Sequence, residues 1–326
     1  MKNPGFGRYA LCSCVAAAML TGCALRQAQD DMPPPIGAPG DINSGARALP
    51  NQKTFHYTGK MQSFKVPAGV TKITVVARGG AGAGETSSSY SYREYFGRGG
   101  RVYAVLPVRP REILYVFVGG QGSLSAGGFN GGGSPGIDAS GREGYGGGGA
   151  SDVRRRGNTL RDRVLVAAGG GAQSCCGFSL FGGKGGPQVG EAGESDYSYG
   201  VGGGEGGTQS QGGAGGAGGI GSGSGSQDGT PGGSGTSGRG GSGGNGAIDG
   251  YCNRSNYQCA GGGGGGGGGG YYGGGGGGGG EGDAYYGAPG GGGGGGSSYV
   301  ESRATRVQMW RGWKKATGNG LVVFSW

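Results

Sequence analysis

The chain has 326 residues, of which 97 are glycine and only 33% are hydrophobic, and its formal net charge is +9. Glycine usually makes up about 7% of a protein, so a conventional apolar core can serve only part of this chain; collagen is excluded, because no strict Gly-X-Y repeat rich in proline is present. The positive charge favours attraction to anionic surfaces without identifying a partner.

Residues 1–22 have the pattern of a bacterial lipoprotein signal peptide. Lys2 and Arg8 precede an apolar run of 12 residues, YALCSCVAAAML, which is too short for a permanent membrane-spanning helix. The run ends in LTGC, which resembles a lipobox and predicts that Cys23 is the acylated first residue of the mature protein. Ala24, by resemblance to lipoprotein sorting signals, favours the outer membrane, on the cell surface or the periplasmic face. An ordinary secretory signal with an incidental cysteine is the alternative.

Residues 23–53 are predicted to be the lipidated Cys and a tether rich in proline and glycine. The stretch PPPIGAPG favours an extended, partly polyproline-II backbone that holds the following domain, residues 54–326, away from the lipid. No later run is long and apolar enough to span a membrane. We therefore expect a protein that is anchored to a membrane without crossing it.

Short apolar segments separated by Gly and Pro turns predict an all-β fold. Ile73, Val75 and Ala77 alternate with Lys72, Thr74 and Val76, as in a strand with one buried face. The strands occupy about 55–118, 163–168 and 307–326 and suit a β-sandwich or jelly roll. The expected strands are Phe55–Thr58, Ser63–Pro67, Val70–Arg78, Arg101–Val108, Ile113–Val118, Arg163–Ala168, Val307–Trp313 and Leu321–Trp326.

Glycine-rich insertions are predicted over about 119–150 and 169–298. In two stretches the side chains recur every third residue, which is the period of a polyproline-II-like helix that polyglycine also adopts. Such helices have no internal hydrogen bonds, so they must bond to one another, with Gly-Gly-X runs at the edge and pure glycine inside. A disordered spacer is the alternative. The two series are Glu205, Thr208, Gln211, Ala214, Ala217 and Ile220, and then Arg239, Ser242, Asn245 and Ile248.

Four cysteines remain beyond Cys23 in the mature chain, and in an oxidising envelope they can form two disulfides. One possible pairing joins Cys252 to Cys259 and the neighbours Cys175 and Cys176 to each other in a strained bridge. The alternative is cross-pairing between the two clusters. Zinc is less favoured, because the only histidine, His56, is distant in sequence and the spacing fits no common zinc pattern. We expect neither a metal nor another cofactor.

Three stretches carry a family resemblance: residues 64–75 (FKVPAGVTKITV), residues 128–133 (GFNGGG), and residues 146–154 (GGGGASDVR) running on through RVLVAAGGG. Together they resemble the glycine-rich extracellular region of the anaplastic lymphoma kinase and leukocyte tyrosine kinase receptors, over roughly residues 55–326. The resemblance implies a tumour-necrosis-factor-like β-sandwich with an inserted bundle of polyglycine-II helices, and in the receptors this region binds a protein ligand. The chain lacks the V-A-I-K, H-R-D and D-F-G signatures, so no kinase is expected.

The sequence gives little support to catalysis or nucleotide binding. One histidine and scattered acids provide neither a nucleophile with its base nor paired carboxylates. Copies of G-x-G-x-x-G are expected by chance in this composition, and no helix follows them. Gly97–Arg101 resembles an RGG segment, but an exported protein is not expected to meet nucleic acid. The basic residues form either a solvated face or a surface that attracts anionic envelope polymers.

Tyrosines cluster between the glycine runs and form the candidate binding surface. If the runs are straight rods, these clusters fall where the rods reverse, and tyrosine offers a large amphipathic contact at little entropy cost. For any single tyrosine, sealing the bundle end is the simpler explanation. The candidates are Tyr90, Tyr92, Tyr197, Tyr199, Tyr251, Tyr257, Tyr271, Tyr272, Tyr285 and Tyr286.

The sequence therefore favours a lipid-anchored bacterial envelope protein that displays a non-catalytic binding or adhesion surface for a protein or glycan on a polyglycine-II scaffold. The alternative is a structural or assembly lipoprotein of the outer membrane in which the bundle is a rigid spacer.

Overall fold

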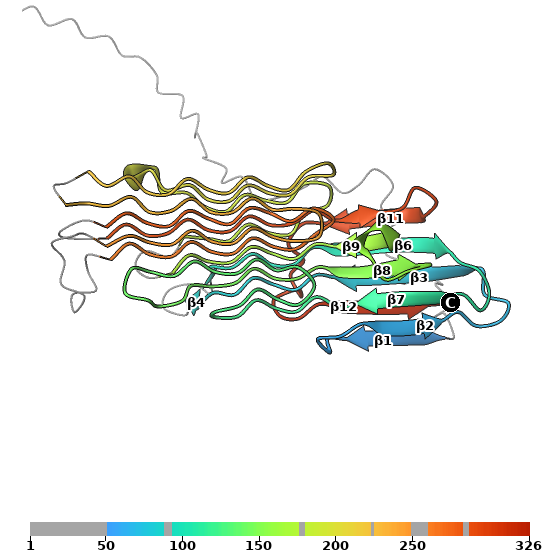
Figure 1. The fold of residues 1–326 in the computed structure, drawn as a ribbon. Coiled ribbons are helices and arrows are strands. Elements are labelled where there is room, and N and C mark those ends of the chain that lie inside the picture. Colours follow the sequence, from blue (N-terminus) through green and yellow to red (C-terminus); the bar gives the residue numbers. More distant parts are fainter. Residues whose placement is uncertain (1–50, 88–92, 176–179, 223–224, 249–259, 283–286) are drawn as a thin grey trace, which may run out of the picture. The chain divides into compact units, whose positions relative to one another are not determined.

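Two antiparallel five-stranded sheets form the strand part of the protein (Figure 1). The computed structural model describes residues 51–87, 93–175, 180–222, 225–248, 260–282 and 287–326. The first sheet has the strand order β1-β12-β3-β6-β11 and the second β10-β9-β8-β7-β2, while β4 and β5 form a separate two-stranded antiparallel sheet. The strands are β1 Gln52–His56, β2 Gln62–Lys65, β3 Lys72–Arg78, β4 Thr86–Ser87, β5 Arg93–Glu94, β6 Arg101–Pro107, β7 Ile113–Phe117, β8 Ser151–Arg155, β9 Arg163–Ala167, β10 Tyr299–Val300, β11 Thr305–Trp310 and β12 Leu321–Ser325.

The all-β class is confirmed. Within the described ranges the only helical elements are two single 3-10 turns, η1 Leu160–Asp162 and η2 Tyr197–Tyr199. The predicted alternation in β3 is also observed, since Ile73, Val75 and Ala77 are buried and the residues between them are partly exposed.

Side chains of both sheets meet in one hydrophobic core. Phe64 of β2 lies edge-on to Phe55 of β1 and Phe324 of β12, with ring centroids 6.2 and 5.2 Å away. Because β2 belongs to the second sheet and β1 and β12 to the first, this aromatic group joins the two sheets. Burial of a phenylalanine side chain contributes about 1.5–3 kcal/mol, so the strands supply apolar stabilisation that glycine cannot.

A strand lies in each of the eight segments that the sequence predicts, but the short strands β4 and β5 and the strands β8 and β10 were not predicted. The pattern SDVRR of β8 has no apolar alternation, because Asp152 and Arg154 are buried as a pair with Arg154 Nε 2.7 Å from Asp152 Oδ1. Each charge compensates the other, as burial of charges requires. β1 also begins at Gln52, two residues inside the predicted tether.

The glycine-rich insertions form extended segments that lie side by side (Figure 1). In the segment 212–220 the exposure repeats every three residues: Ala214, Ala217 and Ile220 are exposed, while Gly213, Gly216 and Gly219 are buried. Three segments near the end of the insertion are instead buried along their whole length: 261–270, 273–282 and 288–298. The expected division into edge runs and central runs is therefore observed as a pattern of exposure.

Each buried segment is hydrogen-bonded to six others. Gly264, Gly265 and Gly266 each donate one backbone hydrogen bond and accept one, and all six partners belong to different segments. The next three residues, 267–269, repeat the pattern with the same six segments. The first set of partners is Gly136, Tyr145, Ala172, Gly244, Gly277 and Gly291, and the second is Gly133, Gly148, Gly169, Gly241, Gly274 and Gly294.

The segments have two ends. Gly269 accepts a hydrogen bond from Gly169, which lies two residues after β9, so this is the strand-side end. At the opposite end, which we call the tip, Gly262 bonds to Ala288 and Gly280. The three central segments run antiparallel to one another in turn: Gly277 donates to Gly265 and Gly274 to Gly268, and Gly291 donates to Gly278 and Gly294 to Gly275.

The dense contacts predict that a single methyl group at a central glycine disrupts the fold. A Cβ on Gly265 would lie 2.4 Å from the carbonyl oxygen of Ala172 and 2.7 Å from that of Gln173. We expect Gly265→Ala to lower the free energy of unfolding by about 3 kcal/mol or more, as overpacking does. Gly318→Ala is the control, because its Cβ would have only Gln121 Oε1 at 3.8 Å, and it should change stability by less than about 0.5 kcal/mol. Urea unfolding of both variants checks this; equal midpoints would contradict an ordered bundle.

Candidate functional site

The reversal at residues 195–201 presents an exposed tyrosine at the tip. Segment 202–207 starts there, because Gly202 accepts a hydrogen bond from Gly278 in a neighbouring central segment. Asp196 caps η2 by accepting from Ser198 N at 2.9 Å, and Gly200 ends the turn with φ +68°. This rigid turn leaves the Tyr197 side chain 91% exposed. An aromatic ring so exposed contributes nothing to the core, and its whole face is open to solvent.

Two further apolar side chains adjoin Tyr197. Ile220 is 68% exposed, and its backbone N–H donates to the carbonyl of Tyr199, which is itself 37% exposed. We call Tyr197, Tyr199 and Ile220 the tip patch. The sequence predicted Ile220 only as a member of the three-residue series. Ile220 is the one large apolar residue in that series, and this difference could have marked it as a candidate contact residue.

Tyr271 and Tyr272 lie at a reversal, as the sequence predicts, but at the strand-side end. Tyr271 stacks on Tyr299 with ring centroids 4.2 Å apart and lies edge-on to Tyr272. Burial, and then the neighbouring Tyr271 and Glu301, raise the pKa of Tyr299, so its hydroxyl stays neutral. This pair is half-buried in packing and does not share a surface with the tip patch.

Arg163 holds this strand-side reversal in place. It is 6% exposed and donates to the carbonyls of Leu160, Gly270 and Tyr271 at 2.8–3.1 Å. Its guanidinium also lies 4.9 Å from the centroid of the Tyr271 ring. Burial lowers the pKa of Arg163 and the charge of Asp152 acts in the opposite direction, yet an arginine remains protonated. Arg163 thus pairs with the Gly270 carbonyl, which accepts no backbone hydrogen bond from a described residue, and adds a second donor to the Tyr271 carbonyl, which also accepts from Gly238 N.

The remaining predicted site residues lie outside the described residues. These are Cys23, Tyr90, Tyr92, Cys176, Tyr251, Cys252, Tyr257, Cys259, Tyr285 and Tyr286. Cys175 is buried, with 4% of its surface exposed. The disulfide pairing therefore stays a prediction.

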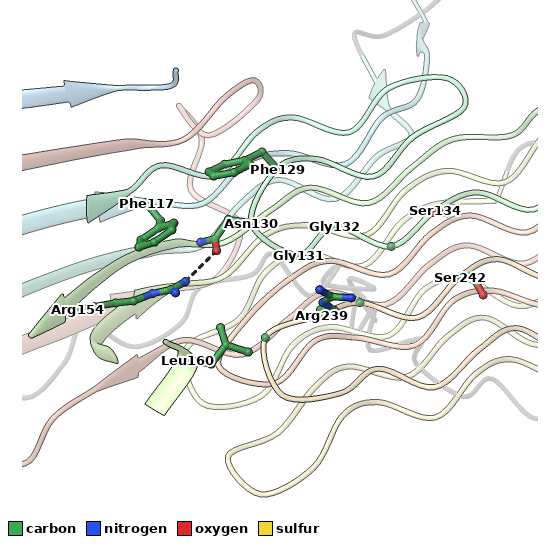
Figure 2. A pocket seen from close by; sticks show the side chains of 13 residues that line it. Phe117, Phe129, Asn130, Gly131, Gly132, Ser134, Arg154, Leu160, Arg239 and Ser242 are labelled. Atoms are coloured by element: carbon green, nitrogen blue, oxygen red, sulfur yellow. Dashed lines mark hydrogen bonds between the residues drawn. The ribbon is translucent and has the colours of Figure 1, made fainter. Parts of the chain in front are cut away.

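A cavity of about 520 Å³ lies where the second sheet meets the glycine segments (Figure 2). Its wall includes Phe117 at the end of β7, Arg154 of β8 and Leu160 of η1. The loop residues Phe129 to Ser134 and the segment start Gly238 to Gly240 complete it with Ser242. Phe117 and Phe129 stack with ring centroids 6.4 Å apart.

The polar groups of this cavity are mostly engaged within the protein. Arg154 forms an ion pair with Asp152 and donates hydrogen bonds to Asn130 Oδ1 and Asn158 O. Its guanidinium carbon lies 3.7 Å from the centroid of the Phe117 ring, in a cation–π contact. Asn130 has φ +66° and donates in turn to Asp152, a backbone conformation that asparagine tolerates. This network fixes the junction between sheet and segments, leaving aromatic edges and the exposed Arg239 as the groups offered to a ligand. The lining residues include no nucleophile paired with a base.

Two other classes of site have no support within the described ranges. No group of three or more His, Cys, Asp or Glu side chains that could hold a metal ion is found there. No helix in that part of the chain is long and apolar enough to cross a membrane.

The role of Arg163 predicts a large difference between two neighbouring arginines. We expect Arg163→Gln to lower the free energy of unfolding by about 3 kcal/mol, because buried carbonyls lose a charged donor. Arg161→Gln is the matched control, since Arg161 is exposed and makes no side-chain bond to a described residue, and it should change stability by less than about 0.5 kcal/mol. Thermal and urea unfolding measure both. Similar losses in the two variants would contradict the capping role.

Comparison with known proteins gives no relative from which a role could be transferred. No family model matches the sequence, and no curated protein matches it.

Proposed function

We propose that this chain is a lipid-anchored bacterial envelope protein that displays a non-catalytic binding surface on a bundle of polyglycine-II helices. The single observation that carries the scaffold is the six-neighbour hydrogen bonding of the buried glycine segments, repeated every three residues. Three residues per turn is the period of this helix, and each turn offers three N–H and three C=O groups to neighbours. The two sheets are proposed to be the tumour-necrosis-factor-like sandwich, or jelly roll, that the family resemblance implies.

The tip patch is the proposed binding surface. Tyr197 is 91% exposed on a turn fixed by Asp196 and Gly200, and such a ring loses little entropy on binding. Ile220 adds exposed apolar area beside it. A protein or glycan is the proposed partner, and the exposed acids of the edge segments, such as Glu205, favour a partner that is not itself strongly acidic.

The second candidate is a structural or assembly lipoprotein in which the bundle is a rigid spacer. The packing of Tyr271 against Tyr299 favours it, because there the tyrosines seal a bundle end. The two functions differ in whether the tip side chains matter once the fold is intact.

Binding at the tip is tested with the mature chain, residues 23–326, carrying Cys23→Ser to remove the acylation site. We expect saturable binding on an array of glycans and envelope proteins, and at least tenfold weaker binding for Tyr197→Ser with Ile220→Ser, since each loses a central apolar contact. Val307→Ser with Val189→Ser is the control: both valines are exposed, at 42% and 48%, and neither is in the tip patch. Unchanged binding by the tip variant at equal stability, or no saturable binding at all, would favour the spacer.

The membrane anchor has its own test in cells that express the full-length protein. We expect Cys23→Ser to move the protein from the outer-membrane fraction to the soluble periplasmic fraction, because acyl chains provide the attachment. Protease added to intact cells then distinguishes the cell surface from the periplasmic face. Membrane attachment that survives the Cys23→Ser change would contradict the lipoprotein assignment.

A further inference from the structure

Among the described residues, the strand part carries a net positive charge and the glycine segments a net negative one. Residues 51–78, 101–118, 151–167 and 299–326 contain 18 Lys and Arg against 4 Asp and Glu. The other described residues, which form the glycine segments and their reversals, contain 5 against 10. Electrostatic fields of this size orient a protein at a charged surface.

Many of these cations lie at the end of the sheets farthest from the glycine segments. The loops there follow Lys65 of β2, Pro107 of β6, Arg155 of β8 and Val300 of β10. The register confirms the shared level, because Lys65 pairs with Ile113, and Leu114 with Arg155. We call this the basal end. Its exposed arginines are Arg109, Arg111, Arg156 and Arg303 in the loops and Arg306 near the start of β11.

Of the three acids in the basal loops, Asp162 accepts hydrogen bonds from Thr159 and lines the second hollow. The other two bind Arg155. Its Nη1 donates to Glu301 Oε1 at 3.1 Å, its Nε lies 3.7 Å from Glu112 Oε1, and its Nη2 donates to Pro107 O at 2.6 Å. These carboxylates are thus committed to a partly buried strut that ties three loops together. They are not available to neutralise the exposed arginines around them.

Three exposed arginines surround this strut without a partner. Arg109, Arg156 and Arg303 are exposed and have no side-chain hydrogen bond or ion pair among the described residues. Two adjoining hollows of about 320 and 310 Å³ share Arg155, Arg156 and Arg303 in their walls. Each hollow is wide enough for a headgroup-sized anion, and guanidinium groups bind phosphate oxygens in pairs.

The backbone supports a role for these side chains. Arg111, Arg156 and Arg306 have φ of +67°, +70° and +52°. This left-handed region is strained for a residue with a Cβ, whereas glycine adopts it freely. Of the five non-glycine residues with positive φ in the described ranges, three are arginines of the basal end. Of these three, Arg156 lines both hollows, so its strained backbone holds a guanidinium at the proposed site.

We propose that the basal end binds the phosphate-bearing headgroups of the membrane surface beside which the chain is tethered. The strand register places Gln52, at the start of β1, at the basal end. Gln52 pairs with Ser325 of β12, and Ser325 pairs with Thr74 of β3. Thr74 in turn pairs with Val105, near the end of β6. The chain therefore enters the fold from the tether at the basal end. The choice of a membrane as occupant rests on the proposed lipid anchor, and it places the tip on the side away from the membrane.

The experiment uses residues 23–326 with Cys23→Ser, so that no acyl chain contributes and the outcome is independent of the anchor. Sedimentation with vesicles is measured for phosphatidylcholine alone and for phosphatidylcholine mixed with phosphatidylglycerol. We expect binding to the mixed vesicles only, weakening as salt is added. Arg109→Gln, Arg156→Asn and Arg303→Gln together should reduce the partition coefficient about a hundredfold, at about fivefold for each Arg near the surface.

The control variant removes three positive charges elsewhere, with Arg311→Gln, Lys314→Gln and Lys315→Gln. These three residues are exposed and follow Trp310, at the end of β11 that faces away from the basal end. The control variant should retain most of the binding. Arg156→Asn alone should unfold at an equal or higher urea concentration than the parent, because asparagine tolerates the left-handed backbone, so lost binding cannot be ascribed to misfolding. Equal losses in the two triple variants, no binding to mixed vesicles, or binding to immobilised polyphosphate without binding to vesicles would overturn the proposal.

Discussion

The backbone hydrogen bond between neighbouring glycine segments is the interaction on which the rest of this structure depends. A segment with no internal bonds must pair every N–H and C=O group with a neighbour, and the buried segments do so in six directions. The spacing that permits this leaves no room for a Cβ: on Gly277 it would lie 2.0 Å from the carbonyl oxygen of Gly291. Composition follows from that constraint. Pure glycine is required in the centre, and side chains are admitted once in three residues at the edge and freely only at the reversals.

The sheets supply what the glycine segments lack. Ordering glycine costs more conformational entropy than ordering any other residue, and these segments bury little apolar side-chain area. Segments leave the strands directly, as Gly79 follows β3, Gly119 follows β7 and Gly169 follows β9, so the sandwich core fixes their starting positions and spacing. Arg163 of β9 extends this control to a central segment that is remote in sequence by capping its reversal. The apolar core and the glycine segments are therefore connected parts of one compact unit.

Much of this arrangement follows from local pattern, and the remainder does not. Alternation predicts β3, and the three-residue series predicts which residues of 212–220 are exposed. Pattern fails where a residue is stabilised by a distant one: β8 is a strand because Asp152 and Arg154 compensate each other and Asn130 joins them. It also fails to say at which end a tyrosine lies. Tyr197 and Tyr271 both follow glycine runs, but only the pairing of segments places the first at the tip and the second beside β10.

These placements separate two kinds of surface on one scaffold. Along the bundle, side chains project only from edge segments and at every third residue, which is too sparse for a large complementary interface. Dense groups of side chains occur where that rule is relaxed, at the reversals of the tip and in the strand loops of the basal end. The tip is apolar and acidic around Tyr197, whereas the basal end carries arginines in unfavourable backbone conformations. A rigid bundle that keeps these two ends apart allows the basal arginines to bind an anionic surface without bringing the acids of the glycine segments against it. The same hydrogen-bonded lattice that excludes side chains from the centre thereby determines where recognition can occur.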